Sequence, residues 1–317
     1  MTEEPPGPVH RSPATALPAP AATATASATA DAVRAAAEHG RLCGVVSQAQ
    51  RDLQSCVEKH SGLFDGKPFD ATLLGAVSSA NVFGSPDDPA ERLEIANRTS
   101  LWIFGLDWLV DYRARTRADL DGIEAECRAA AADEPYTGGS PLGAFLREIR
   151  DRLATAPAFA ERHPVWRDEL ERMLAAMARE WEWKTASARP TFDDYLANAD
   201  NFGSTFVNVS HWIFTGDAAA LSRLDALRAV SRKVQQVLRL LNDLATYRRD
   251  VTWGDLNALL LGVDRDAVTR RIGELVDECH TALGPLHEAC PREAVYLERQ
   301  IGYSMGFYGI ADYWGRL

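Results

Sequence analysis

The spacing of apolar residues constrains the fold of this chain most strongly, because that spacing is typical of α-helices from about Asp31 to the C-terminus. In residues 31–64 and again in residues 217–251, alanine and larger apolar residues recur every three or four positions. This spacing places them on one face of an α-helix. Runs that alternate apolar and polar residues, as strands do, are nearly absent, and no repeat of about 20–50 residues is found. The pattern predicts a single-domain all-α bundle of roughly ten helices over residues 31–317.

Composition limits where the protein acts and what it binds. The chain has 317 residues, of which 46% are apolar, so a sizeable core can be buried. Residues 1–30 are rich in Pro, Ala and Thr and lack the apolar segment of a secretory signal, which predicts a disordered tail. No apolar run approaches the ~18 residues of a membrane span. The five scattered cysteines show no zinc-type spacing and are expected to be reduced and mostly buried, so we expect a cytoplasmic protein.

The net charge of −11 bears on the class of ligand. An acidic protein gains nothing from the release of counterions, so nucleic-acid binding is not expected. An anionic ligand would need local basic residues or metal ions to overcome the overall field.

The stretch LLNDLATYRRD, residues 240–250, interrupts a leucine-rich helical pattern with polar groups. Asn242, Thr246 and Asp250 follow one another at intervals of four, so they share one helix face. An amide, a hydroxyl and a carboxylate form the set of oxygen ligands that Mg²⁺ accepts. Arg249 could reach a phosphate bound to that metal. A solvated helix face with an incidental Asn and Thr is the alternative interpretation.

A second acidic stretch, LWIFGLDWLVDY, covers residues 101–112. Asp107 and Asp111 lie four apart in an aromatic and aliphatic setting. Two acids on one face of an apolar segment are costly unless they are paired or bind a metal. The alternative is a helix end that emerges into solvent, with Asp111 near Arg113 or Arg115.

Together the two stretches resemble the metal motifs of the class I terpene synthase family, and the resemblance extends from about Asp31 to the C-terminus. NDLATYRRD is similar to the family's Asn-Asp-x-x-(Ser/Thr)-x-x-(Lys/Arg)-(Glu/Asp) motif at every ligand position. DWLVD is similar to the Asp-Asp-x-x-Asp motif at the first and fifth positions, but Trp108 stands at the second. The polar contacts of a middle acid are therefore not expected here.

Two further segments resemble members of this family that act on already cyclised C20 diphosphates, as kaurene-type synthases do. Near Gly203-Ser204 the family breaks a helix, and the freed carbonyls face the cavity. Ala199 stands where many bacterial sesquiterpene members carry a diphosphate-sensing arginine. The segment WGDLNALLLG, residues 253–262, is similar to a Gly-x-x-Asn-Ala segment of the diterpene enzymes, although an ordinary turn after a helix would also explain it.

The resemblance implies a Mg²⁺-dependent class I diterpene synthase, a lyase that ionises a C20 prenyl diphosphate and releases diphosphate. The substrate would be a bicyclic labdane- or clerodane-type diphosphate or geranylgeranyl diphosphate. Three Mg²⁺ ions are implied, two held by Asp107 and Asp111 and one by Asn242, Thr246 and Asp250. The resemblance is also compatible with a homodimer and with a substrate supplied by a separate class II diterpene cyclase.

Further residues are implied in catalysis or substrate binding. Basic candidates for the diphosphate are Arg249, Arg248 and Lys233. Gly203 and Ser204 are the candidates at the helix break. Aromatic candidates for the cavity wall are Trp102, Phe104, Trp108, Trp181, Phe202, Phe206 and Trp212, although an aromatic residue taken singly belongs more often to the core than to a cavity wall. The C-terminal aromatics Tyr303, Phe307, Tyr308 and Tyr313 resemble a segment that caps the closed site, although a packed last helix explains them as well.

Two alternatives to the diterpene synthase stay open at this point. One is a sesquiterpene synthase that acts on farnesyl diphosphate, and the other is a non-enzymatic helical scaffold that uses the polar faces to bind partners. A shift in melting temperature with Mg²⁺ and pyrophosphate separates an enzyme from a scaffold.

Overall fold

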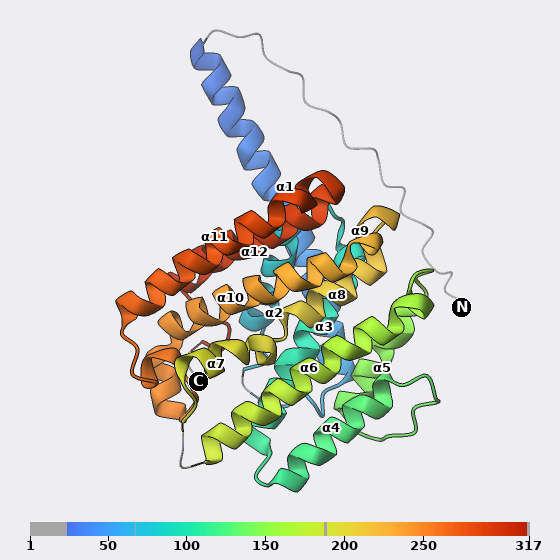
Figure 1. Ribbon diagram of the computed structural model, residues 1–317. Helices are drawn as coiled ribbons and strands as arrows, with labels where there is room; N and C mark the ends of the chain where they lie inside the picture. The colour runs from blue at the N-terminus through green and yellow to red at the C-terminus, as the bar shows by residue number, and fades with distance from the viewer. Residues whose placement is uncertain (1–23, 67, 187–188, 316–317) are drawn as a thin grey trace, which may run out of the picture. The chain divides into compact units, whose positions relative to one another are not determined.

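The computed structural model describes residues 24–66, 68–186 and 189–315. Within these residues the chain forms twelve α-helices and no β-strand, which confirms the predicted all-α class (Figure 1). The α-helices are α1 (Ala24–Lys59), α2 (Ala71–Gly84), α3 (Ala90–Trp108), α4 (Arg117–Ala131), α5 (Pro141–Leu153), α6 (Phe159–Thr185), α7 (Phe192–Ala197), α8 (Ser204–Thr215), α9 (Ala218–Ser222), α10 (Leu224–Trp253), α11 (Arg265–Ala289) and α12 (Pro291–Tyr308). Three short turns of other helix types are η1 (Leu109–Arg113), η2 (Ala199–Phe202) and η3 (Ala258–Leu260).

Helix α1 begins at Ala24, so the predicted tail over residues 1–30 extends too far. The rest of that predicted tail, residues 1–23, lies outside the described residues. The sequence ATASATA at 24–30 is rich in alanine, which has the highest helix propensity, and can therefore extend the helix that follows. By its internal contacts the chain divides into two compact units, residues 1–41 and 42–317, and the division falls within α1.

The larger unit is built around α3 and α8, both of which are buried on several sides. The apolar stretch from Leu101 to Leu106 in α3 is almost entirely buried, as is Thr205–Ile213 in α8. Burial on several sides is expected of helices at the centre of a large α-helical domain. Accordingly α3 packs against α2, α5 and α8, while α8 also packs against α6 and α10.

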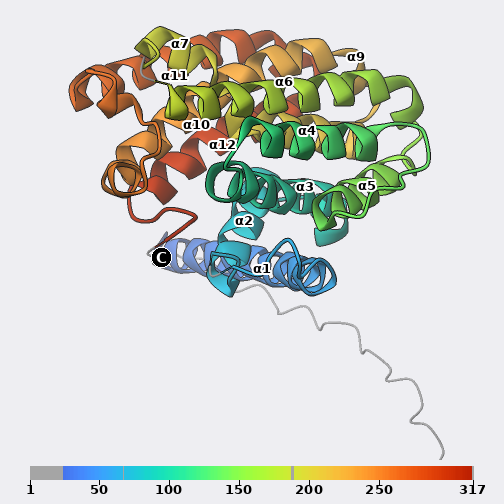
Figure 2. The same ribbon diagram turned by 90° about the horizontal axis from the view of Figure 1, so that it is seen from below.

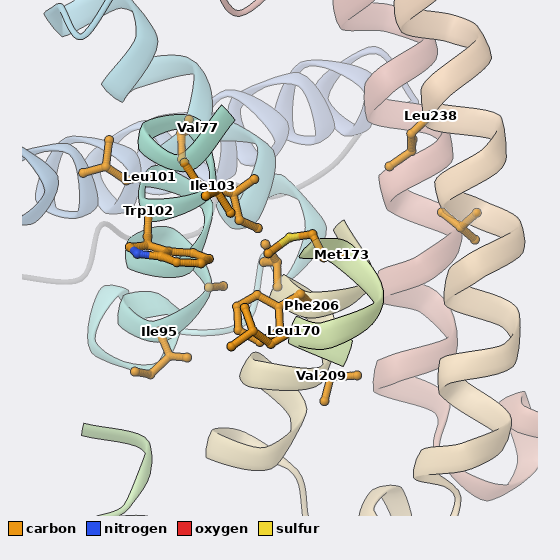
Figure 3. Packing of buried hydrophobic residues seen from close by; sticks show 14 of the residues in the cluster. Val77, Ile95, Leu101, Trp102, Ile103, Leu170, Met173, Phe206, Val209 and Leu238 are labelled. Atoms are coloured by element: carbon orange, nitrogen blue, oxygen red, sulfur yellow. The ribbon is translucent and has the colours of Figure 1, made fainter. Parts of the chain in front are cut away.

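The remaining helices surround this pair. Helices α10, α11 and α12 lie side by side, and α4 packs against α5 and α6 (Figures 1 and 2). Helix α10 is amphipathic over 30 residues, with buried positions such as Leu227, Val234 and Leu238 at helical spacing. In the core between α3, α6 and α8, the Phe206 ring lies near Trp102 and Leu170 (Figure 3). No helix within the described residues is long and apolar enough to cross a membrane.

The cysteines behave as predicted. All five are free, and Cys43 is exposed while the other four are buried. Burial raises the pKa of the Cys279 thiol to about 11, which keeps it protonated and unreactive at neutral pH.

Candidate active site

A cavity of about 220 Å³ lies in the larger unit. It is lined by residues of α2, α3, α6, α8, α10 and α12, of the turns η1 and η2, and of the chain that follows α10 and α12. Along α3 its wall runs from Ser100 through Ile103 and Phe104 to Asp107. These positions share one helix face and span about 10 Å at 1.5 Å per residue. Asp111 in η1 continues the wall by one further turn. One end of the cavity is therefore acidic, and the wall toward Ser100 is mixed apolar and polar.

The two acids of the first motif lie where α3 changes its winding. After Trp108 the chain continues as a π-helical turn from Leu109 to Arg113, closed by a hydrogen bond of 2.8 Å from the Ala114 amide to the Leu109 carbonyl. Such turns frequently occur at functional sites because they shift side chains out of the α-helical register. Asp107 and Asp111 both line the cavity, as the spacing of four predicts.

The electrostatics of these two acids are suited to a bound cation. Burial raises the pKa of Asp107 well above its ordinary value, and the nearby Asp111 and Asp255 carboxylates raise it further. Burial also raises the pKa of Asp111 to about 6, although the Lys184 ammonium opposes this shift. Among the described residues, no side chain forms a hydrogen bond or ion pair with Asp107. Burial and mutual repulsion disfavour the negative charge on these two carboxylates. A divalent cation prefers such oxygen ligands, and its binding would stabilise their ionised forms.

The second motif lies on α10, on another wall of the same cavity. Asn242 and Asp250 line the cavity, whereas Thr246 is buried beside them. The Thr246 hydroxyl donates to Asp250 Oδ2 at 2.6 Å and also lies 2.9 Å from the Asn242 carbonyl oxygen. The contacts therefore bring the oxygen atoms of Asn242, Thr246 and Asp250 into one cluster, as their spacing predicted. An amide, a hydroxyl and a carboxylate fit Mg²⁺ chemistry, as the sequence predicted.

The segment after α10 orients this cluster. Gly254 ends the helix with φ of 78°, a left-handed conformation that glycine adopts without a steric penalty. The turn returns Asn257 beneath the motif, where its Nδ2 donates to Asp250 Oδ2 at 2.8 Å and to the Asp243 carbonyl at 2.9 Å. WGDLNALLLG is thus more than an ordinary turn, because its asparagine holds a motif carboxylate in place.

Asp243, the second residue of the motif, is buried away from the cavity. It accepts hydrogen bonds of 2.9 Å from the Tyr195 hydroxyl and 3.1 Å from the Ala258 amide. Burial raises its pKa to about 7, although the Arg239 guanidinium opposes this shift. This acid ties α7 and η3 to α10 and is no candidate for direct contact with a ligand in the cavity.

The sequence interpretation missed several charged residues on the cavity wall. Glu180 of α6 and Arg239 of α10 both line the cavity and form an ion pair at 2.8 Å. Arg239 precedes Asn242 by three positions, so helical spacing alone could have identified it. Glu180 and Asp255 carried no such signal, because they reach the cavity from elements that stand outside both motifs.

Of the three basic residues predicted to bind the diphosphate, the structure places one on the cavity wall and two outside the cavity. Arg249 lines the cavity, where it forms a 2.8 Å ion pair with Asp312, and its guanidinium lies 5.1 Å from the centroid of the Trp253 ring. Arg248 is exposed on the outer face of α10 and is not on the cavity wall. Lys233 is likewise outside the cavity, because its ammonium pairs with Glu278 on α11. Their placement does not support the predicted contact of Arg248 and Lys233 with substrate.

The chain breaks between α7 and α8 at the predicted position. Gly203 lies between η2 and α8 with a left-handed φ of 77°, and α8 begins at Ser204 on the cavity wall. A Cβ added at Gly203 would lie 2.9 Å from Ile103 Cδ1, so a larger residue does not fit without movement. Gln235 Oε1 accepts hydrogen bonds from the Ser204 hydroxyl at 3.2 Å and from the Thr205 amide at 2.9 Å.

The aromatic candidates divide between the cavity and the core. Those on the cavity wall are Phe104, Phe202, Tyr303, Tyr308 and Tyr313, together with Tyr112 and Trp314, which the sequence interpretation did not include as candidates. Phe206, Trp102 and Trp212 are buried in the core instead, at 1%, 0% and 1% exposure. Trp108 packs against Phe69, Tyr112 and Trp314, and neither it nor Trp181 or Phe307 is on the cavity wall. Helix packing, which sequence spacing does not reveal, decided this division.

Fold and site together describe an all-α enzyme in which acidic and amide side chains of two helices meet at one end of a cavity with aromatic walls. The chain belongs to the terpene synthase family: residues 98–280 match the family described as "Terpene synthase family 2, C-terminal metal binding". It is accordingly a class I terpene synthase, a lyase that uses a divalent metal cofactor and a prenyl diphosphate substrate.

Individual relatives agree with this assignment. The chain is 26% identical over 274 residues to an ent-pimara-9(11),15-diene synthase of Streptomyces sp. (strain KO-3988), an alignment that covers 83% of this chain and 90% of the relative. Among solved structures it is similar to 2-methylisoborneol synthase from Streptomyces coelicolor A3(2) in complex with Mg²⁺ and 2-fluoroneryl diphosphate, with a TM-score of 0.64 and 18% identity over 84% of this chain and 90% of that one. It is also similar to linalool/nerolidol synthase from Streptomyces clavuligerus, with a TM-score of 0.65 and 15% identity over 84% of this chain and 94% of that one. At these identities the two structures show the fold alone.

Proposed function

We propose that this protein is a Mg²⁺-dependent class I diterpene synthase that ionises a C20 prenyl diphosphate, either linear geranylgeranyl diphosphate or a bicyclic labdane- or clerodane-type diphosphate. The observation that carries the proposal is the meeting of both motifs at one end of the aromatic cavity, with Asp107 and Asp111 on one wall and Asn242 and Asp250 on another. The C20 class is supported by the diterpene synthase relative, whose alignment covers 83% of this chain.

We propose that the two motifs together bind three ions. Asp107 and Asp111 would hold two Mg²⁺ ions, and Asn242, Thr246 and Asp250 would hold the third. When bound, Mg²⁺ neutralises the diphosphate and so favours its departure from the allylic carbon. Because Asn and Thr are neutral, the second site carries one formal negative charge, and we expect it to bind metal weakly until diphosphate adds oxygen ligands. Metal and diphosphate should therefore bind with positive coupling of about 1–3 kcal/mol.

The protein's other task is to receive the anion and protect the cation. Arg249 lies on the cavity wall and already forms an ion pair with Asp312, so its guanidinium is placed to exchange that partner for a diphosphate oxygen. Phe104, Phe202 and Tyr308 line the cavity, where aromatic side chains would exclude water and can stabilise positive charge on the substrate's carbon skeleton.

The setting of this activity is also part of the proposal. A bicyclic substrate requires a separate class II cyclase that acts first, and a linear one does not. We further propose a cytoplasmic location, and assembly as a homodimer is the state to be tested by gel filtration with light scattering.

Product analysis tests the proposal directly. The purified protein is incubated with C10, C15, linear C20 and bicyclic C20 diphosphates in Mg²⁺, and hydrocarbons are identified by mass spectrometry. We expect a C20 product that disappears with chelator and returns with Mg²⁺. Asp250→Ala should abolish it, whereas Asp277→Ala, which removes an exposed acid of α11, should not. Turnover of a C15 diphosphate alone would indicate the sesquiterpene alternative, and full activity in excess chelator would overturn the metal-dependent mechanism.

A further inference from the structure

A carboxylate outside both motifs connects them. Asp255 Oδ1 accepts from the Lys184 ammonium at 2.8 Å, and Asp255 Oδ2 accepts from the Tyr112 hydroxyl at 2.9 Å. The same ammonium donates to Asp111 Oδ1 at 2.9 Å. On the other side, the backbone amide of Asp255 donates to the Asp250 carbonyl at 3.0 Å. A continuous series of contacts therefore runs from the last acid of the first motif to the last acid of the second.

These ionic contacts are partly shielded from water. The side chains of Lys184, Asp111 and Asp255 are 16%, 24% and 17% exposed, so their interaction is weakened less by solvent than that of a surface pair. The three residues come from α6, from η1 and from the turn after α10. A single ammonium thus joins three elements that are distant in sequence.

The ammonium reaches Asp111 from outside the cavity. Asp111 and Asp255 are on the cavity wall and Lys184 is not. Because Lys184 occupies Asp111 Oδ1, Oδ2 of the same carboxylate is left for a ligand. Partners behind a ligating group fix its orientation, and their loss typically weakens metal affinity by about 10–100-fold.

We infer that Lys184 and Asp255 form a brace that sets the orientation of Asp111 and the separation of the two motifs before metal binds. This inference rests on the proposed metal-dependent function. Lys184 is a positioning residue: it acts through Asp111 and Asp255 and makes no contact with substrate. Without the ammonium between them, these two carboxylates would repel each other, and the π-helical turn would lose one of its two ties to Asp255 while keeping the hydrogen bond from Tyr112.

A brace and a simple charge predict opposite effects on metal affinity. If Lys184 acted only as a nearby positive charge, it would repel Mg²⁺, and its removal would tighten metal binding. If it holds the carboxylates in position, its removal weakens metal binding. The sign of the change therefore distinguishes the two roles.

The test is calorimetric titration of Mg²⁺ in the presence of pyrophosphate, followed by measurement of the Mg²⁺ dependence of turnover. We expect Lys184→Met to bind Mg²⁺ about 10–100-fold more weakly than wild type, and Lys184→Arg to recover part of the loss. Lys59→Met is the control, because Lys59 also forms an ion pair with a carboxylate, that of Glu148, but lies on the surface. Unchanged or tighter binding by Lys184→Met would overturn the inference.

A double-mutant cycle with Asp255→Asn provides the second measurement. If both residues act through one brace, the double variant should bind Mg²⁺ only slightly more weakly than the worse single variant. Additive losses would overturn the inference. Melting curves monitor folding, and if Lys184→Met does not fold, Lys184→Arg and Asp255→Asn carry the same comparison. Wild-type protein that neither binds Mg²⁺ with pyrophosphate nor needs metal for turnover would instead refute the proposed function.

Discussion

Replacing Asn257 should both destabilise the fold and weaken the metal site, and the structure allows the two effects to be separated. The Asn257 side chain is completely buried below the second motif. Its Nδ2 donates to the Asp250 carboxylate at 2.8 Å and to the Asp243 carbonyl at 2.9 Å, and its Oδ1 accepts from the Leu259 amide at 3.0 Å. Asn257→Ala removes all three hydrogen bonds without adding atoms.

The magnitude follows from the partners. A hydrogen bond to a charged group contributes about 1.5–3 kcal/mol and each of the other two about 0.5–1.5 kcal/mol. The expected loss of unfolding free energy is therefore about 2.5–6 kcal/mol. Asp250 keeps only the Thr246 hydroxyl and Arg249 as side-chain partners, so its carboxylate can leave the position in which it would bind metal. Metal activation should weaken by about 10–100-fold, as for other residues that orient a ligand.

Asn198 offers a matched control. It is also buried, its Nδ2 donates to the Ala176 carbonyl at 2.8 Å, and its Oδ1 accepts from Arg179 at 3.1 Å, but it is not on the cavity wall. Urea unfolding without metal gives the stability of each variant, and the Mg²⁺ dependence of turnover gives the metal requirement. Asn198→Ala should lose stability and keep the wild-type metal requirement. Equal metal requirements in both variants, or a fully stable Asn257→Ala, would refute the reasoning.

Three further predictions follow from buried groups. Thr246→Ser should keep turnover near wild type, because the hydroxyl that donates to Asp250 remains. Thr246→Val has nearly the same volume but no hydroxyl, so it should lose most of the turnover. A fully active Thr246→Val variant would contradict this prediction. Burial raises the pKa of Asp243 to about 7, so folding favours its protonated form and its contribution to stability declines as pH rises from about 4 to about 7. Urea unfolding without metal, repeated across this pH range, measures the decline, and Asp243→Asn should remove it. If the stability of wild type and of Asp243→Asn changed with pH in the same way, the pKa shift of Asp243 would not contribute. Gly203→Ala should lower the free energy of unfolding by about 1–3 kcal/mol, because φ at residue 203 is 77°. Gly302→Ala is the control and should not lower it, because an added Cβ on α12 meets open space there. Melting curves compare the two variants, and equal stabilities would contradict strain at residue 203.

The local pattern of the sequence determined the class of fold and the positions of both motifs. Helical periodicity depends on residues within one or two turns, so it could place Asp107 near Asp111, and Asn242 near Thr246 and Asp250. The structure keeps each of these groups together. The helix break at Gly203 was expected from the resemblance of this segment to the family, and the structure has a left-handed glycine there.

Only the tertiary structure decided which distant residues join the site. Phe104 and Phe206 are both aromatic residues near a motif or the helix break, yet one is on the cavity wall and the other is in the core. Lys233 is on the same helix as the second motif but faces Glu278, whereas Lys184, from α6, contacts Asp111. The physical reason is that contacts between helices depend on which faces pack together and at what angle. That geometry is set by the packing of the whole core, so the spacing of residues within any single helix does not contain it.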